Sequence, residues 1–123
     1  MIRTQEIDRD QWISFLDSFS REHEGWRVNI EVEDPAMGSQ TQSTDMPLQG
    51  ISADTKGGRE HDIAIIVGKE HNPALTHIIP RVTHLRVMQS DGGTEEALQI
   101  ESEAGETTIV RFRAAMRPET VNR

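Results

Sequence analysis

The apolar residues near the start of the chain recur at three- and four-residue steps, which is the spacing of an amphipathic helix. The members of this stripe are Trp12, Ile13, Phe15, Leu16 and Phe19. Asp8, with Gln11 three residues later, has the pattern of a capping box at a helix start. Gly25 can adopt the left-handed conformation that ends many helices. The pattern therefore predicts a helix from about residue 9 to about residue 23, with its aromatic side chains in the core.

After this helix the period of the pattern changes to two. The apolar positions of the next segment are Trp26, Val28, Ile30 and Val32. Alternation with polar residues is typical of a strand that has one buried face and one face in water. Asp34 and Pro35 then favour a turn.

The stretch from Ser39 to Asp45 contains no apolar residue. We interpret it as a polar edge strand rather than a mobile loop. Natural sheet edges are usually guarded by charge, and here only Asp45 is charged. A weak strand follows at Met46–Ala53, in which Pro47 predicts an edge or a bulge. The polar stretch is therefore a candidate for pairing with a partner's strand or with a second copy of the chain.

The second half of the chain is rich in strand patterns. Strands are expected at residues 62–68, 75–79, 82–89 and 97–102, and in a final segment through Val110 and Phe112. Residues 62–68 are apolar at successive positions, which predicts a central strand. A three-residue loop of Glu103-Ala104-Gly105 places Leu98 opposite Val110 and puts glycine at the left-handed position of the loop.

One helix followed by six or seven short strands leaves no second helix for a parallel crossover. We therefore expect an α+β fold, with the N-terminal helix packed on a mostly antiparallel, strongly bent sheet or on a small barrel of the SH3 or Sm-like kind. A chain of 123 residues fits a single domain over residues 1–123. Residues 117–123 are expected to form a frayed tail.

The charge balance limits the classes of partner. The chain has 13 Lys and Arg residues against 21 Asp and Glu residues, for a net charge of −8. This sign disfavours a single-stranded nucleic-acid module, because phosphate binding needs a basic surface. Such a module would need to gather Arg81, Arg86, Arg111, Arg113 and Arg117 on one face. No apolar run is long enough to span a membrane, so we expect an acidic, soluble, cytoplasmic protein without a membrane partner.

Two groups of carboxylates follow the strand patterns. They are Glu31, Glu33 and Asp34 in the first half, and Glu101, Glu103 and Glu106 around the last hairpin. We interpret both groups as solvated sheet surface with cross-strand partners such as Arg111 and Arg113, rather than as a pair of catalytic acids.

Histidines supply the only candidate chemistry. The four candidates lie within one part of the chain, at His61, His71, His77 and His84. Histidine is the commonest protein metal ligand, but the spacing matches no zinc-enzyme motif. The sequence contains no cysteine, which excludes thiolate metal ligands and cysteine nucleophiles. We therefore predict no catalytic, cofactor-binding or metal-ligating residue and no cofactor, and we keep these histidines as the site of an alternative function.

Several segments together resemble an uncharacterised bacterial family of unknown function, DUF5335. They are Asp8–Trp12, Phe15-Leu16, Phe19–Arg21, His23–Trp26, Leu48–Asp54, Leu75–His77, Ala97–Ser102 and Arg111–Arg113. The resemblance covers nearly the whole chain and implies a bacterial protein of this length, but no activity or site.

We expect a non-catalytic binding or assembly module that recognises a protein partner or itself. The first alternative is a small ligand- or metal-binding protein, or an enzyme, that uses the four histidines. The second is the nucleic-acid module disfavoured above.

Overall fold

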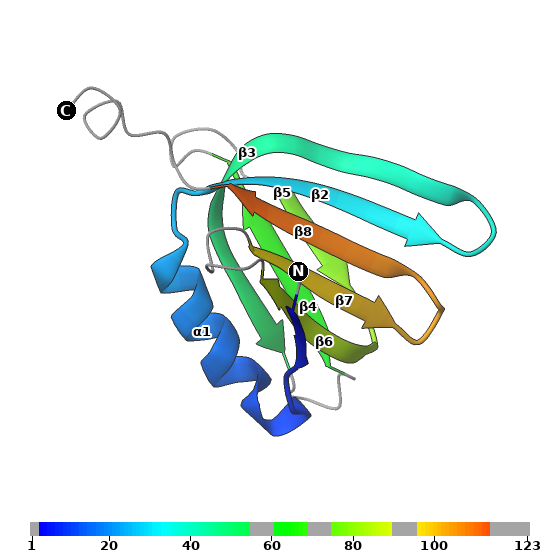
Figure 1. Cartoon of the computed structure of the whole chain (residues 1–123), viewed down its shortest axis with the longest axis horizontal. Helices are drawn as coiled ribbons and strands as arrows, with labels where there is room; N and C mark the ends of the chain where they lie inside the picture. Colours follow the sequence, from blue (N-terminus) through cyan, green and yellow to red (C-terminus); the bar gives the residue numbers. More distant parts are fainter. Residues whose placement is uncertain (1–2, 55–60, 69–74, 90–95, 114–123) are drawn as a thin grey trace.

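The computed structural model of the chain describes residues 3–54, 61–68, 75–89 and 96–113. Within these residues a strongly curved antiparallel sheet packs against one helix (Figure 1). The elements are β1 (Arg3–Glu6), a 3-10 turn η1 (Arg9–Gln11), α1 (Trp12–Glu22), β2 (Arg27–Asp34), β3 (Gly38–Asp54), β4 (Asp62–Val67), β5 (Leu75–Ile79), β6 (Val82–Gln89), β7 (Glu96–Ser102) and β8 (Thr107–Arg113). The α+β class and the antiparallel sheet are confirmed.

The sheet has eight strands in the order β1-β6-β7-β8-β2-β3-β4-β5. The prediction of six or seven strands was therefore wrong, because β1 was missed. All four residues of β1 are exposed, so this strand lacks the alternation by which a half-buried strand is identified. The alternative of a closed barrel was also wrong, since β1 and β5 are left as separate edges of the sheet.

Strand β4 lies next to the β5 edge rather than at the centre of the sheet. Its burial alternates, with Ile63, Ile65 and Val67 buried and the intervening Ala64 and Ile66 only half-buried. The prediction of a central strand was therefore wrong. A strand made of successive apolar residues can still have only one buried face, because aliphatic residues also occur on the outer face of a sheet.

Strand β3 is long and bent, and each half has different neighbours. Its first half pairs with β2, and its second half, from Leu48 to Asp54, pairs with β4. Helix α1 lies along the other side of that second half. There the Ser20 hydroxyl accepts a hydrogen bond from the Ile51 N–H (2.8 Å) and donates one to the Ile51 carbonyl (2.9 Å). On this side of β3 the Ser20 side chain thus takes the place of β2, whose pairing with β3 ends at Pro47.

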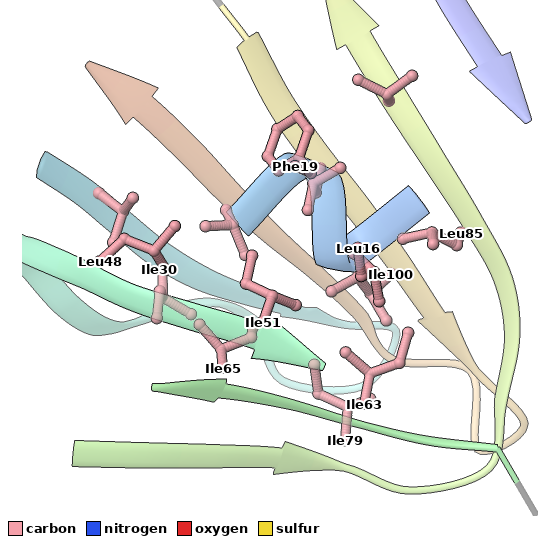
Figure 2. Packing of buried hydrophobic residues seen from close by; sticks show 14 of the residues in the cluster. Leu16, Phe19, Ile30, Leu48, Ile51, Ile63, Ile65, Ile79, Leu85 and Ile100 are labelled. Carbon is pink, nitrogen blue, oxygen red and sulfur yellow. The ribbon is translucent and has the colours of Figure 1, made fainter. Parts of the chain in front are cut away.

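The core lies between the concave side of the sheet and helix α1 (Figure 2). The helix contributes Trp12, Leu16 and Phe19, all of which are buried, as the apolar stripe predicted. Phe15 and Trp26 are partly buried against the same cluster.

The start of the helix differs from the capping-box prediction. Residues 9–11 form a 3-10 turn, and the Asp8 side chain makes no capping hydrogen bond. Instead the Gln11 N–H donates to the Asp8 carbonyl (2.9 Å). The buried Trp12 indole N–H donates to the Ile7 carbonyl (2.9 Å). These bonds tie the helix start to the end of β1.

The last hairpin has the predicted register. Leu98 lies opposite Val110. The Ser102 N–H bonds the Glu106 carbonyl (2.9 Å), which closes the three-residue loop. Gly105 has a φ of +96°, a value that glycine adopts without strain.

Candidate functional site

The described histidines lie in separate places and do not form one site. His84 is on the outer face of β6, where its Nδ1 is 2.7 Å from a carboxylate oxygen of Glu6. His77 is on β5 opposite Ile65 and is half-buried. His61 precedes β4, and its ring meets Trp12 edge-on at 5.7 Å between centroids. His71 falls outside the described residues. Across the described ranges, no three His, Cys, Asp or Glu side chains gather in a way that could hold a metal ion.

A shallow hollow lies beside the start of the helix. It is lined by Arg9, Asp10, Ile13 and His61. The Arg9 guanidinium lies 5.5 Å from the centre of the Trp12 ring, within reach of a cation–π contact. The His61 Nδ1 is buried and has no hydrogen-bond partner among the described residues, so this ring nitrogen does not open into the hollow. The arrangement offers a place for a small group but no nucleophile with an adjacent base.

His23 was not singled out by the sequence pattern, although it is 4% exposed. Its ring stacks on Phe19 at 4.0 Å and also contacts Trp26 and Phe112. Its Nδ1 lies 2.8 Å from the Phe19 carbonyl and so donates to it. This histidine therefore acts as a core residue.

Three of the five arginines proposed for nucleic-acid binding have carboxylate partners. The pairs are Arg86 with Glu6 (3.3 Å) and Glu101 (3.1 Å), Arg111 with Glu31 (4.0 Å), and Arg113 with Asp45 (2.5 Å). Arg81 lies at the exposed corner between β5 and β6, and Arg117 is outside the described residues. The three paired cations are neutralised locally, which weakens their capacity for phosphate.

The polar stretch predicted as an edge strand is the first half of β3. In the part of the chain that the structure describes, residues 38–46 pair with β2 on one side and with no strand on the other. All of these residues are exposed except Ser43 and Met46. The edge-strand interpretation is therefore confirmed.

Asp45 does not guard this edge in the way a free charge would. It adopts a φ of +57° at a bulge in β3. Its N–H donates to the Asn29 Oδ1 (2.6 Å), and its carbonyl accepts from Arg27 (2.9 Å). Its carboxylate is held by Arg113 at 2.5 Å. The one negative charge of the stretch is thus neutralised.

Strand β5 is a second open edge, and the sequence analysis did not find it. Among the described strands only β4 pairs with it. Leu75 and Ile78 are 47% and 63% exposed. They lie on opposite faces of the strand, because side chains point to alternate faces and these two residues are an odd number of positions apart. No residue of β5 is charged. Pro73 and Pro80 bracket the strand in the sequence, but prolines outside a strand mark its ends and do not indicate an edge position.

The surface beside the middle of β5 is also uncharged, and the nearest charges of β3 and β4 are Asp54 and Asp62 at one end of these strands. On the outer face of the sheet Ile78 continues into Ala64 and Ser52, and Thr76 continues into Ile66. On the inner face, burial lowers the pKa of the His77 imidazole below its ordinary value of 6.5. The His77 Nε2 is buried and has no partner among the described residues. An uncharged, apolar, unpaired strand edge has the chemistry of a protein-docking site.

Residues 3–121 match the family described as "Family of unknown function (DUF5335)". The chain belongs to the DUF5335 family. A similar protein is an uncharacterised protein of Aquifex aeolicus (strain VF5), 26% identical over 113 residues, which are 92% of this chain and 95% of that protein. No solved structure matches this DUF5335 chain. The resemblance seen in the sequence is confirmed, and it brings no assigned activity.

In the ranges of this DUF5335 chain that the structure describes, no helix has the length and apolar character to cross a membrane.

Proposed function

We propose that this chain is a non-catalytic protein-binding module, in which the open edge of β5 takes an extended segment of a protein partner as an additional strand. The observation that carries the proposal is the exposure of Leu75 and Ile78 on an uncharged strand that has only one neighbour among the described strands. An exposed apolar edge of this kind is a template for strand pairing, and natural proteins that leave it unguarded use it or suffer aggregation.

The chemistry of the edge specifies the partner segment. Main-chain hydrogen bonds to β5 supply affinity without regard to side chains. Leu75 and Ile78 offer apolar contact on both faces of the added strand, so the segment carries aliphatic residues at successive positions. Strand β4 already pairs with β5 in this way through Ile63, Ile65 and Ile66. The net charge of −8 favours basic rather than acidic residues on either side of the segment.

A peptide with the central sequence of β4 between lysine pairs, Lys-Lys-Ile-Ala-Ile-Ile-Val-Lys-Lys, is a suitable probe. We expect saturable binding by fluorescence anisotropy. Hydrogen–deuterium exchange should show new protection in β5, because about half of the N–H groups of an edge strand point away from its only neighbour. Ile78→Lys should weaken binding by about ten-fold or more, since it places a charge that must lose water against aliphatic side chains.

Two controls separate strand addition from non-specific adhesion. Ser18→Lys adds the same charge at an exposed position of helix α1 and should bind the probe like the wild type. The same peptide with its central isoleucine replaced by proline cannot complete the strand pairing and should not bind. Equal binding of both peptides, or binding by Ile78→Lys at wild-type strength, would show that β5 is not a strand acceptor. A cytoplasmic location stays a prediction.

A further inference from the structure

We propose that the free half of β3, residues 38–46, is a self-association edge at which two copies of the chain pair antiparallel across a two-fold axis near Thr41. This interface is separate from the β5 edge and does not depend on the function proposed for it. It would turn the chain into a dimer that presents two β5 edges.

The free half of β3 has the backbone that such pairing needs. Residues 38–41 pair regularly with β2, with Thr41 opposite Glu31 and Gly38 opposite Asp34. Their outer side meets no other described strand. Ser43 is 8% exposed, and its hydroxyl has no hydrogen-bond partner among the described residues. This hydroxyl is covered by the chain's own atoms, so the pairing depends on the backbone of residues 38–41 and not on the Ser43 side chain.

Charge is distributed unequally along this edge, and this distribution selects the occupant. The end near the β2–β3 turn is acidic, with Glu33 exposed and Asp34 beside it on β2. Backbone N–H groups of Ala36 and Met37 lower the pKa of the Asp34 carboxyl below 3.8 and keep it ionised. The other end keeps one net positive charge, because Asp45 neutralises Arg113 with its carboxylate but binds Arg27 only through its backbone carbonyl. The two ends are separated by about 20 Å of extended strand.

An antiparallel second copy satisfies both ends at once. With the axis near Thr41, the acidic end of each copy lies beside the basic end of the other. A parallel arrangement would place like charges together, which costs free energy. The charged residues of the two copies need not lie on adjacent strands, because an arginine side chain can reach across a strand. Arg113 on β8 already reaches over β2 to Asp45 on β3, at 2.5 Å. A basic peptide would satisfy only the acidic end, and it would meet Arg27 and Arg113 at the other.

The net charge of −8 per copy does not prevent this pairing. Every residue from 38 to 44 is uncharged, so no carboxylate is buried where the strands meet. Repulsion between the remaining charges is screened over about 8 Å at physiological salt. The two copies therefore meet at a neutral stretch, residues 38–44.

In the proposed dimer, Thr41 of one copy lies next to Thr41 of the other copy across the axis. A charge introduced at this position therefore tests the interface. We expect the wild type to show a concentration-dependent monomer–dimer equilibrium in sedimentation velocity. Thr41→Lys and Thr41→Glu should each raise the dimer dissociation constant by about ten-fold or more, because like charges then lie directly opposite one another. An equimolar mixture of the two variants should restore a dimer, and native mass spectrometry should identify it as the heterodimer.

Thr41 is exposed, so circular dichroism should show both variants folded like the wild type. Ser18→Lys is the control for added charge and should dimerise normally. A wild type that stays monomeric throughout the concentration range overturns the inference. So does a dimer that survives both Thr41 variants, or a pair of monomeric variants that fail to combine. A dimer lost in Ile78→Lys but retained in both Thr41 variants would place the contact at β5 instead.

Discussion

The half-buried imidazole of His77 makes the folding free energy depend on pH. Burial lowers the pKa of this group in the folded chain below 6.5. Between the two pKa values the unfolded chain binds more protons than the folded chain. The contribution of His77 to the free energy of unfolding is therefore complete above about pH 6.5, and it is lost as the pH falls through the pKa of the folded state.

His77→Gln should remove this contribution. Urea unfolding at about pH 7.5 and about pH 5.5 should show a smaller loss of stability on acidification than in the wild type. Thr76→Ala changes an exposed neighbour without a titratable group and should keep the wild-type loss. An equal loss in His77→Gln and the wild type would mean that this imidazole is not the group responsible.

Single residues were predictable from the sequence when their role was set by apolar periodicity. Trp12 and Phe19 are buried as predicted. The Asp8 cap was wrong, because a 3-10 turn supplies a backbone bond in its place. His23 was missed, since a polar residue in the core depends on aromatic neighbours such as Phe112, which lies far away in the sequence.

The helix and the second half of β3 are joined by one hydroxyl. Ser20 gives Ile51 both a donor and an acceptor, at 2.9 and 2.8 Å. Ser20→Ala would leave the Ile51 N–H and carbonyl without that partner, and we expect a loss of about 1–3 kcal/mol in the free energy of unfolding. Ser18→Ala, at an exposed position of the same helix, should change it by less than about 0.5 kcal/mol. Urea titrations of both variants measure the difference, and equal stabilities would show that water replaces the hydroxyl.

Edges of the sheet were only partly predictable from sequence patterns. Periodicity indicates which face of a strand is buried, and polarity identified the stretch from Ser39 to Asp45 as an edge. Neither pattern indicates which strands become neighbours. Among the described strands, β5 lies at the end of the sheet because it pairs with β4 alone. Strand β6 begins after only two intervening residues and pairs with β1 and β7. The apolar edge at Leu75–Ile79 is therefore a product of topology.

At the scale of the whole molecule, the sequence patterns could not distinguish a barrel from an open sheet, because they do not indicate which strands become neighbours. The sequence predicted one helix on a bent antiparallel sheet, and this is confirmed. Closure depends on whether the first and last strands of the order meet. The first strand is β1, whose four exposed residues carry no apolar alternation. The open edge of β5 follows from this architecture, whereas the free half of β3 arises because the two halves of that bent strand pair with different neighbours.

The two proposed edges are far enough apart to act independently. Thr41 lies seven residues before Leu48, where β3 begins to pair with β4, a separation of about 20 Å along the strand. Sites at this distance with no shared partners contribute additively. Thr41→Lys should therefore bind the lysine-flanked peptide within about two-fold of the wild type, with one peptide per chain by titration calorimetry.

Ile78→Lys should complete the test by dimerising like the wild type while losing the peptide. The double variant should lose both properties and still unfold cooperatively, because both side chains are exposed and exposed substitutions cost little stability. If Thr41→Lys also loses the peptide, the peptide binds at β3 or needs the dimer. If Ile78→Lys also loses the dimer, the two copies meet through their apolar β5 strands.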